Sequence, residues 1–206
     1  MHQTLTDHGL KILWQDEHMV VVDKPSGLPS QAGRDGRPGV VELLGSVLPY
    51  VALHHRLDQP ASGLMALALS KAANPGLARA FRERSAKRTY HAVLGCPVKS
   101  TRWTQSVDGK SAQTSVEILG EGSGFCAARL RLHTGRKHQI RLHAAMAGAP
   151  VVGDRRHGGE VGRAWPRLAL HAARLQLEHP VHGGPIDVVS PIPDDLKMLW
   201  RLAGGT

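Results

Sequence analysis

The sequence has few cysteines and no long apolar run. Cys96 and Cys126 are the only cysteines, and they form no Cys-x-x-Cys pattern. Neither a disulfide scaffold nor a zinc knuckle is therefore indicated, and two free thiols in a reducing cytoplasm are expected. No apolar stretch approaches the roughly 20 residues of a membrane span, and the N-terminus lacks a signal peptide's basic and apolar regions. We expect a cytoplasmic protein without a membrane association.

The sequence is strongly basic, with a formal net charge of +9 at pH 7. A positive field over part of the surface favours an anionic partner such as nucleic acid. On charge alone, an arginine-rich proteome explains the same composition equally well. The 206 residues, 41% of them hydrophobic, are enough for one sizeable core. Because no repeat or linker divides the chain, we expect a single domain over residues 1–206.

The first half of the chain alternates short apolar segments with turn residues. A hairpin is expected over residues 11–22, and a short helix within residues 41–48. Residues 64–69 are apolar throughout, which is typical of a central strand covered on both faces. Asn74-Pro75 predicts the N-cap and first turn of a helix that ends at about Ser85.

The second half indicates an antiparallel, meandering sheet. The expected strands share an apolar or alternating pattern and cover residues 87–95, 112–119, 125–133, 168–177 and 186–189. Thr134 is expected to cap a short helix that Gly148 closes, with His138 and Arg141 one turn apart. Cationic groups at a helix N-terminus are destabilising unless a phosphate or a buried carboxylate compensates them.

The densest chemical motif is His55-Arg56-Leu57-Asp58-Gln59-Pro60-Ala61-Ser62-Gly63. Its single carboxylate lies between a basic flank and a Pro/Ser/Gly turn, directly before the predicted central strand. This pattern indicates a site on a loop at the mouth of a strand. Asp58 is the first candidate for a catalytic residue.

Five blocks, taken together, resemble the RluA-type pseudouridine synthases. They are residues 55–63, 87–90, 135–143, 148–154, and 170–172 with His179-Pro180. The likeness extends from about Ile12 to Pro193, and the segment from Asp16 to Pro29 is similar to the start of that family. The resemblance implies an α+β fold around a curved, mixed, mostly antiparallel sheet with flanking helices and a central active-site cleft. It also implies isomerisation of uridine to pseudouridine in structured RNA, with no metal or organic cofactor.

The resemblance implies that Asp58 is the nucleophile or charge stabiliser, acting through a covalent sugar adduct or a glycal. Such a carboxylate needs a fixed cation, for which Arg141 is the expected partner and Arg136 the weaker candidate. Tyr90 would stack on the uracil and assist proton removal at carbon 5. Arg56 would replace the flipped-out base or hold the flanking phosphates.

Other residues are expected to contact RNA or to support the site. The expected RNA contacts, besides Arg56, are His55, Arg84, Lys87, Arg88, Arg136 and His138. The expected supporting residues are Ser62, Gly63 and His171. Candidate phosphate contacts include Arg79, Arg82, Arg155, Arg156 and Arg163. Although the chain has 13 histidines, the five-residue spacing of His138 and His143 forms a poor helical zinc pair, and no metal is expected.

Each assignment has a simpler alternative. Asp58 is otherwise an exposed ion-pair residue, Tyr90 a core aromatic, and Arg141 a helix-surface charge. Ala61 stands where the family usually has Thr, and Gln59 where it often has a charged residue, which affects efficiency or substrate choice more than reaction type. Two alternative functions for the whole protein are a catalytically silent RNA-binding protein and a nucleoside hydrolase that attacks C1′.

About ten residues precede the first expected strand, so no separate RNA-binding module is expected ahead of the core. We therefore expect a monomer with a core at 12–193, tails at 1–10 and 194–206, and a compact target such as a tRNA anticodon stem-loop or an rRNA hairpin.

Overall fold

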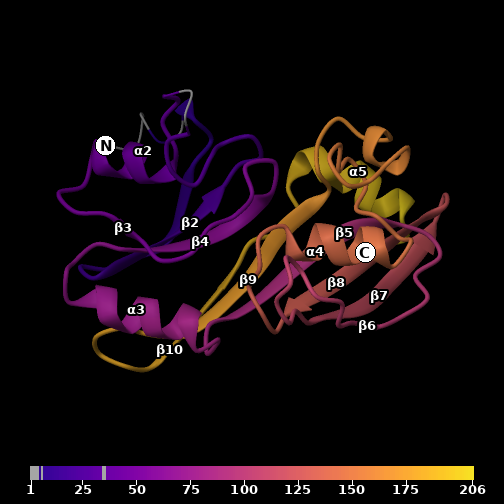
Figure 1. The fold of residues 1–206 in the computed structure, drawn as a ribbon. Helices are drawn as coiled ribbons and strands as arrows, with labels where there is room; N and C mark the ends of the chain where they lie inside the picture. The colour runs from indigo at the N-terminus through magenta and orange to yellow at the C-terminus, as the bar shows by residue number, and fades with distance from the viewer. Residues whose placement is uncertain (1–4, 6, 34–35) are drawn as a thin grey trace. The chain divides into compact units, whose positions relative to one another are not determined.

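A computed structural model describes residues 5, 7–33 and 36–206. The chain forms two compact units, both of which are discontinuous in sequence. The first contains Met1–Lys87 and Arg174–Ser190, and the second contains Arg88–Ala173 and Pro191–Thr206. Figure 1 shows the ribbon of both units. The single catalytic domain over 1–206 and its central cleft stay predictions.

The first unit is built on antiparallel strands. Strands β1 (Lys11–Gln15) and β2 (Met19–Lys24) form the predicted hairpin. Strand β4 (Ser62–Ala68) pairs with β2 from Met19 opposite Ala68 to Lys24 opposite Gly63. The short strand β3 (Ala52–Leu53) also pairs with β4. Strand β10 (Pro185–Val189) pairs with β9 (Leu170–Glu178), whose first four residues belong to the second unit.

Strand β4 is the core of this unit, because all of its residues are buried. Leu64, Ala66 and Ala68 pack with the buried face of helix α3 (Ala73–Arg82). Helix α2 (Val40–Gly45) lies on the other side of β2 and β4 in Figure 1. The prediction of a strand covered on both faces is confirmed.

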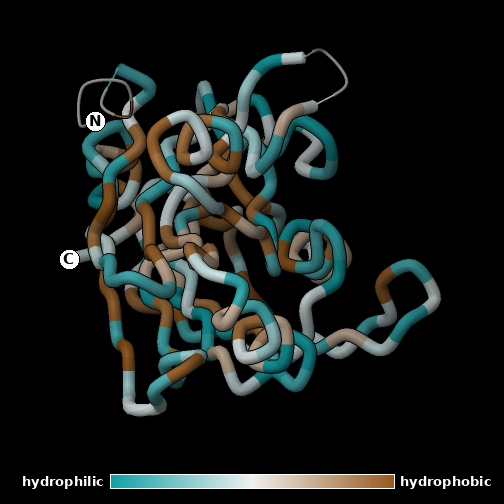
Figure 2. Tube along the Cα trace, turned by 90° about the vertical axis from the view of Figure 1, so that its left-hand side faces the viewer, coloured by the Kyte–Doolittle hydropathy of each residue, from teal (hydrophilic) through white to brown (hydrophobic). Residues whose placement is uncertain are grey.

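Along the trace, hydrophobic segments alternate with hydrophilic turns (Figure 2).

Helix α3 begins earlier than the sequence indicates. Its N-cap is Ala72, so the assignment of Asn74 as N-cap is wrong. The Asn74 side chain instead donates to the Tyr50 hydroxyl (2.6 Å) and accepts from His54 Nε2 (3.0 Å). The Asn74 side chain therefore serves contacts with residues 20 and 24 positions away, while the first helical amide, Ala73 N, bonds to Ser70 (3.2 Å to O and 3.3 Å to Oγ).

The second unit continues the antiparallel pattern. Strand β5 (Lys87–Gly95) neighbours β8 (Phe125–Leu132), followed by β7 (Thr114–Gly122) and β6 (Arg102–Trp103). The β7–β8 turn consists of Ser123 and Gly124, both with positive φ (53° and 77°), and is shorter than the expected five residues. Positive φ at both positions is typical of a tight two-residue hairpin turn. The α+β fold class with a mostly antiparallel sheet is confirmed.

Helix α4 (Gln139–Met146), the 3-10 turn η1 (Val161–Arg163) and helix α5 (Asp194–Leu202) complete this unit. Residues 194–206 are therefore not a simple tail, since α5 buries Leu196, Leu199 and Trp200. Their spacing follows one face of a helix, which explains why the segment folds onto the unit. Of the expected tail 1–10, residues 1–4 and 6 lie outside the described part.

The two cysteines form a disulfide, so the expectation of free thiols is wrong. Pairing of β5 with β8 sets Leu94 opposite Cys126 and Gly95 opposite Phe125. This register brings the Cα atoms of Cys96 and Cys126 to 5.7 Å, within the usual range for a disulfide. The pairing depends on strand register, which the 30-residue separation alone does not reveal. In the described part of the chain, no helix has the length and apolar character needed to cross a membrane.

Candidate active site

The loop that carries Asp58 is tied down by a fully buried lysine. Lys24, the last residue of β2, has 0% exposure. Its Nζ lies 2.6–3.1 Å from four backbone carbonyl oxygens. Two of these oxygens, at Gln59 and Ala61, lie in the turn that follows Asp58. The other two, at Pro25 and Leu28, lie in the turn that directly follows β2. The ammonium thus joins two loops far apart in sequence.

Serine side chains complete this attachment. Ser30 Oγ donates to the Leu57 carbonyl (2.8 Å) and accepts from the Leu57 amide (3.1 Å). Ser26 Oγ donates to the Pro60 carbonyl (2.8 Å), and the Asp58 carbonyl accepts from Ala61 N (3.0 Å). The backbone on both sides of Asp58 is therefore fixed, while the residue itself stays half-buried.

His55, predicted to contact RNA, is only 9% exposed. Its Nε2 accepts a hydrogen bond from Ala66 N (2.9 Å), and its ring stacks on Phe81 with centroids 4.0 Å apart. This placement favours a supporting role for His55. Ser62 is buried at the start of β4, and Gly63 has a φ of 112°, which a residue with a side chain rarely adopts.

Arg141, on helix α4, is held by a carboxylate that sequence reasoning did not assign. Its Nε donates to Asp154 Oδ2 (2.8 Å) and its Nη2 to Asp154 Oδ1 (2.7 Å). Arg141 is 5% exposed and Asp154 1%. A guanidinium has five N–H donors, and this bidentate pair takes two of them. The alternative of Arg141 as a helix-surface charge is wrong.

Asp154 is itself held in the ionised form. Burial raises its pKa, but hydrogen bonds and charge attraction from Arg141, with amide hydrogen bonds from His157 and Arg156, outweigh this and lower the pKa. The two amides approach Oδ1 at 3.2 and 3.1 Å. The arrangement fixes the orientation of the Arg141 guanidinium.

The start of α4 differs from the prediction. The N-cap is His138, with a left-handed φ of 55°, so Thr134 is not the cap and His138 lies outside the helix. Thr134 Oγ1 instead donates to Gln139 Oε1 (2.6 Å), which also accepts from Arg136 N (3.0 Å). Gly148, with a φ of 72°, follows the C-cap as predicted. A phosphate or a buried carboxylate was expected to compensate the cationic groups of this helix. The buried carboxylate of Asp154, paired with Arg141, is such a group.

The remaining predicted residues have varied surroundings. Tyr90 is 4% exposed in β5 and His171 is fully buried in β9. Among the predicted RNA contacts, Arg56, Arg84 and Lys87 are exposed. Arg88, Arg136 and His138 are half-buried, and His138 Nδ1 lies 3.2 Å from His157 Nε2. Asp58, Ser62 and Gly63 belong to the first unit, and Tyr90, Arg141 and His171 to the second.

Sequence reasoning missed Lys24 and Asp154. Asp154 ends one of the blocks that carry the family resemblance, which was a usable signal. Lys24 follows a buried strand and precedes a Pro-Ser-Gly turn, but lysine is rarely buried, so composition gave no sign of its role.

A family model described as RNA pseudouridylate synthase matches residues 18–146. The dual-specificity RNA pseudouridine synthase RluA of Escherichia coli strain K12 is 39% identical over 204 residues, which cover 88% of this chain and 93% of RluA. The ribosomal large subunit pseudouridine synthase D of Nitrosomonas europaea is 34% identical over 93% of this chain and 64% of its own length.

Solved structures show the same likeness. Human RNA Pseudouridylate Synthase Domain Containing 1 aligns with a TM-score of 0.75 at 26% identity, over 89% of this chain and 84% of that one. Human RNA Pseudouridylate Synthase Domain Containing 4 shares the fold, with a TM-score of 0.79 at 23% identity over 99% and 97% of the two chains. With the family model matching more than half of the residues, the chain belongs to the RNA pseudouridylate synthase family, in its RluA-type branch.

Proposed function

We propose that this pseudouridine synthase isomerises specific uridines in structured RNA with Asp58 as the residue that acts at the sugar. The main support is the Asp58 loop, whose backbone is fixed by Lys24 and Ser30 while Asp58 itself stays half-buried. A carboxylate that attacks or stabilises C1′ needs a defined position, because misplacement by about 1 Å costs on the order of 10²-fold in rate.

The reaction balances without an added oxidant or reductant. The bond from N1 to C1′ breaks, uracil turns, and a bond from C5 to C1′ forms, while the C5 proton leaves and N1 gains one. We propose that Tyr90 stacks on the uracil and assists removal of the C5 proton. Arg56 takes the place of the flipped base, which must leave its stack before the sugar is accessible.

We propose that Arg141 stabilises the negative charge of the Asp58 carboxylate during the reaction, and that Asp154 is a positioning residue for Arg141. The two hydrogen bonds from Arg141 to Asp154 support these two roles, because they fix the direction of the Arg141 guanidinium. A guanidinium stays protonated even when buried, so it stabilises negative charge at any working pH.

The substrates we propose are a tRNA anticodon stem-loop, an rRNA hairpin, or both. The name of RluA of Escherichia coli records dual specificity, which supports a proposal of more than one RNA target for this chain. Structured RNA is recognised through shape and through bases in its loops. We further propose that the protein acts as a monomer in the cytoplasm, without a metal or cofactor in catalysis.

The test is to incubate purified protein with unmodified tRNA and rRNA transcripts in the presence of a chelator, and to map pseudouridine at nucleotide resolution. We expect product at specific uridines from the wild type and none from Asp58→Ala or Asp58→Asn. Equal product from Asp58→Ala would refute the proposed role of Asp58. RNA binding without product would identify a silent binder, and release of free uracil a hydrolase.

The Arg141–Asp154 pair is tested with three variants. Arg141→Met and Asp154→Asn should lower kcat by about 100-fold or more while the Kd for RNA changes little. Because one unpaired buried charge costs about 3–5 kcal/mol, the double variant Arg141→Met with Asp154→Leu removes both charges and recovers stability. If the double variant also recovered turnover, the pair would be structural only.

A further inference from the structure

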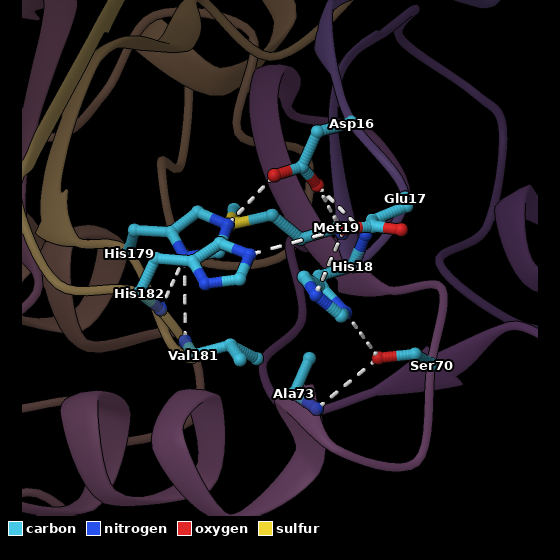
Figure 3. A network of polar contacts seen from close by, with 9 residues as sticks. All are labelled: Asp16, Glu17, His18, Met19, Ser70, Ala73, His179, Val181 and His182. Atoms are coloured by element: carbon cyan, nitrogen blue, oxygen red, sulfur yellow. Dashed lines mark hydrogen bonds and ion pairs between the residues drawn. The ribbon is translucent and has the colours of Figure 1, made fainter.

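Two turns of the first unit bring a histidine-rich cluster together. The turn between β1 and β2 carries Asp16, Glu17 and His18, and the turn between β9 and β10 carries His179 and His182. Figure 3 shows these side chains directed toward one another, with Ser70 beside His18. None of them belongs to the proposed RNA-modifying site.

Asp16 and His179 form a rigid base for the cluster. Asp16 Oδ1 accepts from His18 N and Met19 N, both at 2.8 Å, and Oδ2 lies 2.7 Å from His179 Nε2. His179 Nδ1 accepts from Val181 N (3.3 Å) and His182 N (3.0 Å). Because Nδ1 is an acceptor, Nε2 carries the proton and donates to Asp16. These bonds fix the backbone of both turns and so the origins of the His18 and His182 side chains.

The His18 ring is oriented by a contact with Ser70. Its Nδ1 lies within hydrogen-bond distance of Ser70 Oγ (2.9 Å), and the same Oγ accepts a hydrogen bond from Ala73 N (3.3 Å). Its Nε2 points the other way, 3.4 Å from Glu17 Oε1. A hydrogen bond that fixes one ring nitrogen while the other faces a ligand position is the usual second-shell arrangement of metal-binding histidines.

The spacing of the three outer groups fits a small divalent ion. Glu17 Oε1 lies 3.4 Å from His18 Nε2 and 3.9 Å from His182 Nε2. One ligand atom from each of the three residues lies within 4.8 Å of the other two. With metal–ligand distances of about 2.0–2.1 Å, tetrahedral geometry sets neighbouring ligand atoms about 3.3 Å apart. Closure requires only small side-chain movements, and Glu17 and His182 are exposed enough to make them.

We propose that His18 Nε2, His182 Nε2 and a Glu17 carboxylate oxygen form a zinc site that links the two turns, with water as the fourth ligand. Two imidazoles and one carboxylate suit Zn²⁺, whereas Mg²⁺ and Ca²⁺ require oxygen ligands. Within the described part of the chain, the other group with suitable spacing contains Cys96 and Cys126, whose sulfur atoms are already joined in a disulfide.

The simpler alternative is that Glu17 only makes ion pairs with protonated His18 and His182. The test is a titration of the untagged full chain with Zn²⁺, and separately with Mg²⁺, followed by the imidazole nitrogen signals in NMR and by the thermal midpoint. We expect saturable Zn²⁺ binding that shifts the Nε2 signals of His18 and His182 and raises the midpoint, and no response to Mg²⁺.

Single substitutions decide the assignment. His18→Gln and His182→Gln should each weaken Zn²⁺ binding by at least about tenfold. His8→Gln is the matched control, because His8 is exposed and outside the cluster, and it should bind like the wild type. The proposal is overturned if the wild type does not bind Zn²⁺, or if His182→Gln binds it unchanged. Neither result bears on uridine isomerisation, which is measured with a chelator present.

Discussion

His91 is a histidine that its surroundings hold in the neutral form. It lies in β5, with its ring 5.0 Å from that of Trp200, and its Nδ1 is buried with no hydrogen-bond partner in the described structure. Burial, followed by the charges of His171 and Arg129, lowers its pKa from 6.5 to about 4. The protonated form is therefore disfavoured in the folded protein.

This shift predicts a pH dependence of stability. Because the folded pKa lies below the unfolded one, the unfolded state binds more protons between pH 6.5 and about 4, and the free energy of unfolding falls as the pH drops through this window. Urea unfolding at several pH values should show this loss, and His91→Gln should reduce it. His133→Gln, at an exposed histidine, is the control. An NMR titration that gave His91 a pKa near 6.5 would contradict the prediction.

At the residue scale, the type of group that a site needs was easier to predict than the particular residue that supplies it. A compensating carboxylate was one of two alternatives for the basic start of α4, and Asp154 is that carboxylate. The role of Lys24 was missed, because its acceptors at Gln59 and Ala61 are brought near only by folding. The N-cap at Ala72 was missed because alanine is not a typical capping residue. The proposed roles of Asp58, Tyr90 and Arg141 stay predictions.

At the scale of elements, Lys24 joins the turn after β2 to the loop before β4. Four carbonyl oxygens surround its Nζ, and β2 and β4 are directly paired beside it, with Lys24 opposite Gly63. Without the ammonium, the carbonyl groups of Pro25, Leu28 and Ala61 would lose this donor, at a cost of roughly 1–3 kcal/mol for each one left unsatisfied. The Gln59 carbonyl would keep its hydrogen bond from Gly27 N (2.9 Å).

We therefore expect Lys24→Met to lower the free energy of unfolding by about 3 kcal/mol. The Asp58 loop should also lose its fixed position, so kcat should fall while RNA affinity stays nearly constant. Urea unfolding and single-turnover kinetics measure the two effects. Lys71→Met, at an exposed lysine, should change neither. An active and fully stable Lys24→Met variant would show that the contacts of Lys24 with the four carbonyl oxygens are dispensable.

Strand positions were the most predictable elements, because alternation and apolar runs follow from sheet geometry. Strand β5 matches the predicted residues 87–95. The β7–β8 turn was predicted too long, since the strands continue through Gly120 and Gly122, where glycine-rich sequence resembles a loop. The register that joins Cys96 to Cys126 has no local signal.

At the scale of the whole molecule, exposed cations are spread along the chain. Arg79, Arg82, Arg84 and Lys87 lie close in sequence in the first unit, and Arg155, Arg156 and Arg163 in the second. All seven are exposed, and Arg88 is half-buried. This matches the net charge of +9 and suits binding to phosphates.

If about five of these residues contact phosphates, the log–log slope of RNA affinity against salt should be about −3 to −4. Arg84→Gln and Lys87→Gln should each make the slope about 0.7 less steep. Filter binding at several salt concentrations measures it. Lys197→Gln, whose side chain pairs with Asp194 on α5, is the control. A slope near zero would contradict a phosphate-dominated interaction.

The discontinuous first unit has a consequence for synthesis on the ribosome. Leu175, Leu177, Ile186 and Val188 cover the same core as β4 and α3, yet about 100 residues separate them from the end of the first segment. At roughly 5–20 residues per second, the ribosome needs on the order of 5–20 s to supply them. During this time the apolar face of β4 lacks its final cover. We expect the nascent chain to depend on chaperones until residue 190 has emerged, and its yield to be sensitive to translation speed between residues 87 and 190.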